Sequence, residues 1–184
     1  MFGWISLLRG INVGGHAKIA MADLRALYQG LGFQNVTTYV QSGNVVFSAD
    51  EGDSSRLAQQ IEQQMQSVWG FSVPVLLRGA EDFSRILNTN PFLQRSDTDL
   101  SKLHVTFLTA PVDETRLQGI PSPNADGDEF AAGGQEIFVY CPGGYGRTRL
   151  NNNFFEKKLA QPVTTRNWNT VTVLHRLASE LTVQ

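Results

Sequence analysis

Cysteine is almost absent from this chain, whose 184 residues include one cysteine and three histidines. A single thiol excludes a fold that is stabilised by disulfide bonds within the chain. The histidines and the cysteine also lack the close, repeated spacing of a structural zinc site. We therefore expect no metal centre.

The sequence also lacks a long apolar run. No stretch approaches the roughly 20 apolar residues that a membrane helix needs. Residues Met1–Ile5 carry none of the basic side chains that open a signal peptide. These two absences predict a cytoplasmic protein without a membrane partner.

A strong charge of either sign is absent as well, because the formal net charge is −2. Basic side chains outnumber acidic ones in residues 1–49 and 147–184, and acidic ones are in excess between them. Domains that bind nucleic acid usually have a clear basic excess, since each neutralised phosphate adds a favourable counterion term. Nucleic acid is therefore a less favoured partner than a small metabolite.

Apolar residues make up 41% of the chain, enough for a core, and their periodicity predicts helices and strands. In the first half an apolar run indicates a strand at 2–8 that is buried on both faces, hence central in its sheet. The other expected elements are a helix at 20–31, strands at 36–40 and 45–47, a helix at about 54–69 and a strand at 73–77. Their order is βαββαβ.

The same order returns in the second half. After a helix at about 80–88 and an irregular stretch to residue 101, we expect strands at 103–107, around 130, at 137–141 and at 163–165, with helices at 113–118, 152–160 and 168–181. The alternation predicts that Leu103, Val105 and Phe107 are buried while Lys102, His104 and Thr106 face solvent. Residues 121–124 are predicted to form a loop.

The chain is therefore predicted to be an α+β protein with two tandem ferredoxin-like (βαββαβ) units, antiparallel sheets and additional helices. The first unit is expected at 1–78, a helix and linker at 79–101, and the second unit with a C-terminal helix at 102–184.

This topology predicts a candidate binding site in the first unit. Its first and second strands run the same way, so the loop that follows the first and the turn that follows the second lie at one edge of the sheet. Glycines there let backbone amides approach a ligand, and cationic and amide side chains stand beside them. The candidate ligand-binding residues are Arg9, Asn12, Gly14, Gly15, Lys18, Ser42, Gly43 and Asn44.

This loop matches neither the Walker phosphate-binding pattern nor the dinucleotide-binding pattern of glycines. The alternative interpretation is that Gly14 and Gly15 only turn the chain while Arg9 and Asn12 hold the loop through hydrogen bonds. Ser42, Gly43 and Asn44 alone form an ordinary hairpin turn.

Further candidates lie near the C-terminus. The segment from Thr164 to Trp168 precedes the final helix, where a threonine or Asn167 can cap the helix and Arg166 lies near amides that attract anions. Arg166 and Asn167 therefore join the candidate ligand-binding residues. The glycine-rich loop 143–149 offers an aromatic ring and two arginines, and its arginines are expected near Arg166.

No catalytic group follows from the spacing. Cys141 alternates with Ile137 and Val139, which predicts an inert, buried thiol. Asp126 and Asp128 lack the spacing of a cation-binding loop and are interpreted as a solvated turn. Whether the protein is an enzyme, and whether it uses a cofactor, stays open.

Four segments together resemble the bacterial domain-of-unknown-function 1697 family. They are Leu7–Gly15, Tyr39–Phe47, Asn90–Phe92 and Thr165–Val171, and they occur in the right order across essentially the whole chain. The resemblance implies a duplicated α+β fold and a small, soluble bacterial protein. It implies no activity.

Three functions follow as hypotheses. The leading one is binding of a small anionic or phosphorylated metabolite at the glycine-rich loop. The others are a protein-interaction scaffold that uses the acidic middle of the chain, and a nucleic-acid-binding module. An aromatic-rich strand signature, which would favour the last, does not appear in 39–47 or 136–141.

Overall fold

The computed structural model describes residues 1–121 and 127–181, and within them the chain is a mixed α+β protein with two four-stranded antiparallel sheets and six α-helices. Contacts group the residues into two compact units. One consists of Met1–Ser84 with the C-terminal segment that begins at Val173, and the other of Arg85–Thr172. Helices α3 (Ala80–Thr89) and α6 (Trp168–Leu181) each contribute to both units.

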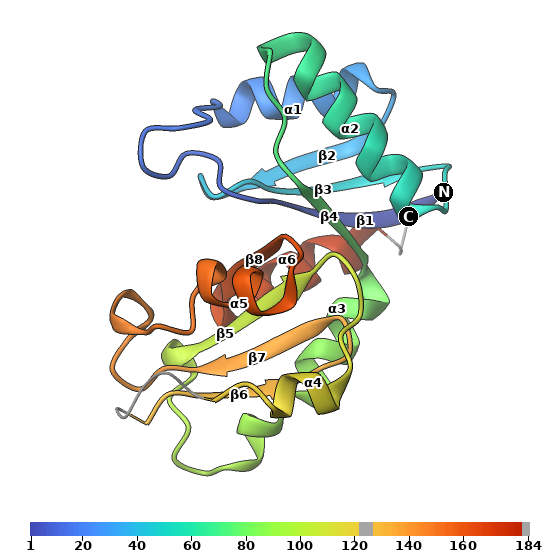
Figure 1. Cartoon of the computed structure of the whole chain (residues 1–184). Coiled ribbons are helices and arrows are strands. Elements are labelled where there is room, and N and C mark those ends of the chain that lie inside the picture. Colours follow the sequence, from blue (N-terminus) through green and yellow to red (C-terminus); the bar gives the residue numbers. More distant parts are fainter. Residues whose placement is uncertain (122–126, 182–184) are drawn as a thin grey trace. The chain divides into compact units, whose positions relative to one another are not determined.

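The first unit follows the expected order of elements. These are β1 (Phe2–Leu8), α1 (Met21–Gly30), β2 (Gln34–Tyr39), β3 (Asn44–Ala49), α2 (Ser54–Trp69) and β4 (Val75–Gly79). The sheet order is β2-β3-β1-β4, so β1 is central as its apolar run predicted. Helices α1 and α2 cover one face of this sheet (Figure 1).

Local chemistry sets the limits of these elements. Asp53 accepts hydrogen bonds from the amides of Ser55 and Arg56 and so caps α2, which ends at Gly70 with a φ of 73°. The strand expected at 73–77 begins two residues later, at Val75. Pro74 has no amide proton to donate to a sheet, and its carbonyl oxygen accepts from Arg9 N instead.

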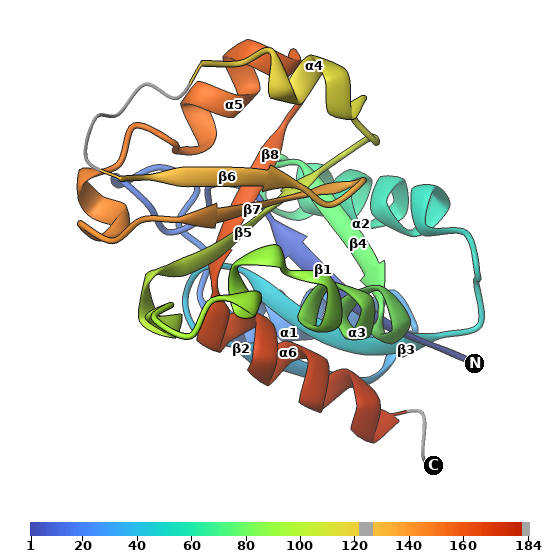
Figure 2. The ribbon, with the colours of Figure 1, turned by 90° about the horizontal axis from the view of Figure 1, so that it is seen from below.

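In the second unit the end of α3 is followed by two short 3₁₀ helices, η1 (Pro91–Gln94) and η2 (Leu100–Lys102). Its other elements are β5 (Leu103–Leu108), α4 (Glu114–Gln118), β6 (Glu129–Ala132), β7 (Glu136–Tyr140), the 3₁₀ helix η3 (Tyr145–Arg147), α5 (Asn152–Leu159) and β8 (Val163–Asn167). The sheet order is β6-β7-β5-β8, which repeats the arrangement of the first sheet. Helices α4 and α5 lie over one face of it (Figure 2).

The expectation that one face of β5 is exposed to solvent is wrong. His104 and Thr106 are 8% and 0% exposed. They share a strand face with Leu108, which packs in a core with Leu117 of α4 and Phe155 of α5. The polar alternation marks a hydrogen-bonded face and not a solvated one, since Thr106 Oγ1 lies 2.8 Å from Thr165 Oγ1.

The structure also describes Asp128, one of the two aspartates that were interpreted as a solvated turn. Asp128 is 7% exposed, so it does not belong to a solvated turn. Burial is the main cause of the raised pKa of the Cys141 thiol, and the charge of Asp128 adds to it. Asp126, the other aspartate, lies outside the described residues. The loop predicted at 121–124 also lies outside them, except for Pro121.

Candidate functional site

The glycine-rich loop of the first unit lies directly beside the β2–β3 turn, as the topology predicted. The side chain of Asn12 donates a hydrogen bond to the carbonyl oxygen of Gln41 at 2.9 Å. The amide of Leu8 donates to the carbonyl oxygen of Gly43, also at 2.9 Å. Two segments about thirty positions apart in the sequence therefore form one edge of the sheet.

The packing between these segments is tight at Gly43. A Cβ atom at this position would lie 2.7 Å from Ile11 Cδ1 and 2.9 Å from Leu8 Cβ, and the φ of Gly43 is 81°. Only glycine combines this backbone conformation with the close approach of the loop. Gly43 thus determines the contact between the loop and the turn.

The tip of the loop is a small two-residue turn. Val13 and His16 form an isolated antiparallel bridge around Gly14 and Gly15, whose φ values are 62° and 79°. Positive φ at both central positions is what such a turn requires. Nothing lies within 4 Å of a Cβ atom built on either glycine, so the tip is open.

Asn12, Ser42 and Asn44, three of the expected ligand-binding residues, hold the edge together through hydrogen bonds of their side chains. Asn12 donates to the carbonyl oxygens of Ile19 and Gln41, both at 2.9 Å, and its Oδ1 accepts from Ile19 N at 2.8 Å. Asn44 is fully buried and its Nδ2 donates to Tyr39 O and Ser42 Oγ at 2.9 and 3.0 Å. These amides position the loop and the turn.

Lys18 and the backbone amides at the tip of the loop are the groups that an outside ligand can reach. Arg9 is half-buried at the end of β1, and Lys18 is exposed. In the part of the chain that the structure describes, no protein acceptor takes the amide protons of Gly14 and Gly15. Unpaired amides and an exposed ammonium group on the same loop can bind an anion through charge-assisted hydrogen bonds.

Arg166 and Asn167 are the last two residues of β8 in the second unit, directly before the last helix. The strand extends to Asn167 because residues 166 and 167 pair with Val105 and His104 of β5. Arg166 is 7% exposed and donates to Thr164 Oγ1 at 2.7 Å and Thr165 O at 3.0 Å. Asn167 Oδ1 accepts from Thr170 N at 2.8 Å and so caps α6, as expected.

Beside Asn167 lies a cavity of about 600 Å³ that sequence reasoning missed. It is lined by Leu100, Ser101, His104, Asn167, Trp168, Asn169 and Thr172. His104 stacks on Tyr145 of η3, with ring centroids 4.4 Å apart. The only sequence signal for this cavity was the polar residue Asn167 directly before an apolar helix. The same pattern is equally typical of a helix cap.

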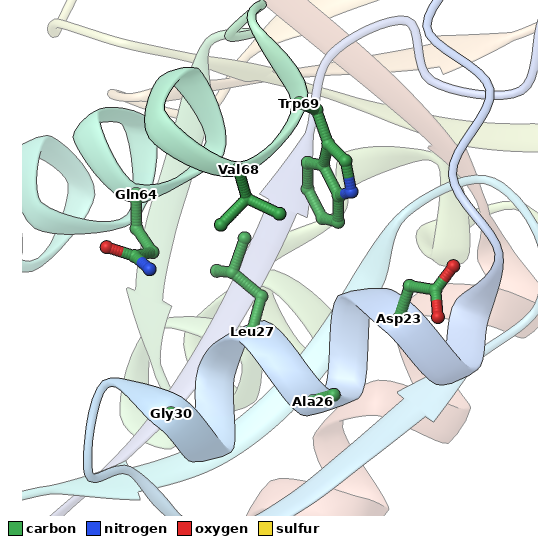
Figure 3. Close-up of a pocket in the computed structure, with 7 residues that line it drawn as sticks. All are labelled: Asp23, Ala26, Leu27, Gly30, Gln64, Val68 and Trp69. Carbon is green, nitrogen blue, oxygen red and sulfur yellow. The ribbon is translucent and has the colours of Figure 1, made fainter.

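A groove of about 470 Å³ separates α1 and α2 in the first unit. Figure 3 shows Leu27 of α1 facing Val68 of α2 across it, with Trp69 and Asp23 toward one end. Asp23 is the charged side chain of the lining. An acidic group among apolar ones does not suit an anion, so this groove is not part of the expected site.

Cys141 is fully buried, as its alternation with apolar residues predicted, and burial raises the pKa of its thiol to about 11. Within residues 1–121 and 127–181, no three His, Cys, Asp or Glu side chains are grouped so that they could hold a metal ion. Every helix in that same part of the chain is too short or too polar to cross a bilayer.

Comparisons with known proteins identify the family and the fold. The family model described as "Protein of unknown function (DUF1697)" matches residues 1–138. The chain is also similar to the solved structure of the conserved bacterial protein SP0830 from Streptococcus pneumoniae, with a TM-score of 0.75 and 24% sequence identity. That similarity covers 96% of this chain and 98% of the other and supports the fold alone. No curated protein matches the sequence.

Proposed function

Because the chain belongs to the DUF1697 family of proteins of unknown function, we propose a function from its own residues: it binds a small anionic or phosphorylated ligand at the glycine-rich loop. The observation that carries the proposal is the open tip of the loop. There the amides of Gly14 and Gly15 have no acceptor among the described residues, and Lys18 is exposed three residues further along the chain.

The rest of the edge supports this role by keeping the loop in place. Asn12 ties the loop to the turn at Gln41, and Gly43 allows the close contact with Ile11. A preformed loop loses less conformational entropy when a ligand binds than a loose one does. Arg9, which leads into the loop, adds a second positive charge to the edge.

A thermal-shift titration tests the proposal. The probes are inorganic phosphate, sulfate, nucleotides and sugar phosphates. A ligand at 100 times its Kd stabilises a protein by about 2.7 kcal/mol, which for a chain of this size raises Tm by roughly 5–10 °C. Lys18→Gln should abolish most of this shift.

The matched control is Lys157→Gln, which removes an exposed lysine from α5 of the second unit. This variant should keep the full shift. The proposal is overturned when no probe raises Tm, or when the two lysine variants respond alike to the probe that does.

We propose in addition that the two halves are duplicated ferredoxin-like units, at 1–78 and 102–184, joined by 79–101, and that the protein works in the cytoplasm. The repeated strand order supports the duplication. A scaffold that uses the acidic residues 50–146, and a nucleic-acid module, remain the alternative functions. RNA binding that persists at 200 mM salt would favour the latter over the anion site.

A further inference from the structure

The cavity beside Asn167 has the size and composition of a small-molecule site. Its volume of about 600 Å³ falls in the range of roughly 300–1,000 Å³ that ligand pockets occupy. Its walls come from η2, β5, the end of β8 and the first turns of α6, all within the second unit. Rigid elements therefore supply most of the lining.

The lining carries no formal charge. It contains no Asp, Glu, Lys or Arg. Its one titratable group is His104, and burial lowers the pKa of this imidazole, with a partly opposing effect of the Lys102 carbonyl. The ring is accordingly neutral at pH 7, so the cavity offers no counter-charge to an ionic ligand.

The ring of His104 is held in one orientation. Its Nδ1 lies 3.3 Å from the carbonyl oxygen of Lys102. A carbonyl only accepts, so Nδ1 carries the proton and Nε2 carries the lone pair. Nε2 has no hydrogen-bond partner among the described residues. It is also not one of their buried atoms that lack a partner, so it is exposed to solvent.

The other polar groups complete a set of donors and acceptors. Asn167 uses its Oδ1 to cap α6, which leaves the protons of Nδ2 without an acceptor in the described chain. Ser101 Oγ donates to Asp99 and Thr172 Oγ1 donates to Trp168 O, so both hydroxyl oxygens keep lone pairs. Ser101, Asn167, Asn169 and Thr172 are all exposed, so these groups lie on the open side of the cavity.

Two aromatic side chains stand among these groups. Trp168 is 8% exposed and lines the cavity. His104 is backed on one face by Tyr145, with the ring planes 24° apart. Flat side chains favour a flat ligand, because stacked rings gain contact area at little conformational cost.

We propose that this cavity binds an uncharged, planar nitrogen heterocycle of the nucleobase class. Such a ring presents acceptors to Asn167 Nδ2 and a donor to His104 Nε2, and it stacks against the aromatic walls. An ionic ligand would find no counter-charge in the lining. An aliphatic ligand would leave the amide and imidazole groups unpaired.

The experiment is an NMR titration of the full chain with adenosine, guanosine, cytidine and uridine, which carry the bases in soluble form. Cyclohexanol serves as an uncharged, non-planar control. The readout is the indole N–H signal of Trp168, assigned with Trp168→Phe, while those of Trp4 and Trp69 report on the first unit. At least one nucleoside should shift the Trp168 signal in a saturable way, and cyclohexanol should not.

Two variants separate recognition from folding. Asn167→Asp keeps an oxygen that can cap α6 but removes the Nδ2 donor, and it should weaken binding at least tenfold. Asn151→Asp makes the same change at the cap of α5, where Oδ1 accepts from Phe154 N at 3.1 Å, and should leave affinity within twofold. His104→Phe keeps a ring against Tyr145 but loses the acceptor, and should also weaken binding at least tenfold.

The inference is overturned if no nucleoside shifts the Trp168 signal at millimolar concentration, or if cyclohexanol shifts it equally. It is also overturned if Asn167→Asp binds as tightly as Asn151→Asp. Every lining residue of this cavity lies in the second unit, so a failure of nucleoside binding is distinguishable from a failure of the anion site at Lys18.

Discussion

Replacing Asn12 by alanine should destabilise the edge that carries the proposed anion site. Asn12 makes three side-chain hydrogen bonds, two to Ile19 and one to Gln41, and its φ is 55°. Each bond contributes about 1 kcal/mol, somewhat less where it is exposed. The left-handed conformation costs alanine about 1 kcal/mol more than asparagine. Together these terms predict a loss of about 2–4 kcal/mol in the free energy of unfolding.

Two companion variants divide this loss into its causes. Asn12→Gly also removes the hydrogen bonds but tolerates the positive φ, so it should be less destabilising than Asn12→Ala by about 1 kcal/mol. Asn35→Ala is the matched control, because Asn35 has a φ of 53° but only a 3.5 Å bond to Ser48 Oγ. It should cost about 1 kcal/mol.

The assay combines urea unfolding with hydrogen exchange. The amide of Ile19 donates to Asn12 Oδ1, so its exchange should be faster in Asn12→Ala and unchanged in Asn35→Ala. A loss in Asn12→Ala no larger than that in Asn35→Ala, together with an unchanged Ile19 exchange rate, would refute the role of Asn12 as the link between loop and turn.

Three further predictions concern other parts of the chain. Gly43→Ala should lower the free energy of unfolding by at least 2 kcal/mol, measured by denaturant unfolding, since its Cβ would clash with Ile11 and Leu8 at a positive φ. Cys141, whose pKa is raised to about 11 by burial, should resist a thiol reagent at pH 8 until urea unfolds the protein, and fast labelling of the native state would contradict this. The pKa of His104 lies below its ordinary 6.5, so its contribution to stability is present above pH 6.5 and lost as the pH falls toward the folded pKa. His104→Phe should therefore flatten the pH dependence of Tm below pH 6.5.

Hydrophobic periodicity predicted the elements and the order of strands well. The run at 2–8 gave the central strand β1, and the alternation of Ile137, Val139 and Cys141 gave one of the two buried faces of β7 and the residue that follows it. Alternation misled at His104 and Thr106, because polar residues on a covered face can pair with one another across strands. Periodicity distinguishes polar from apolar faces, not exposed from covered ones.

The candidate site was predictable only in part. Strand direction alone placed the loop beside the turn, which the contact between Asn12 and Gln41 confirms. It could not show that Asn12 and Asn44 use their amides to hold the backbone, because that depends on side-chain orientation. The cavity of the second unit was missed because Leu100 and Asn167, far apart in the sequence, form its walls together.

The most direct test of the proposed anion site is a titration of the isotopically labelled protein with inorganic phosphate, followed by the backbone amide signals. Gly14 and Gly15 should shift together and saturably in the wild-type chain and in Lys157→Gln, and should shift far less in Lys18→Gln. Signals that stay in place at the two glycines, or that move equally in both lysine variants, would show that the loop is only a turn.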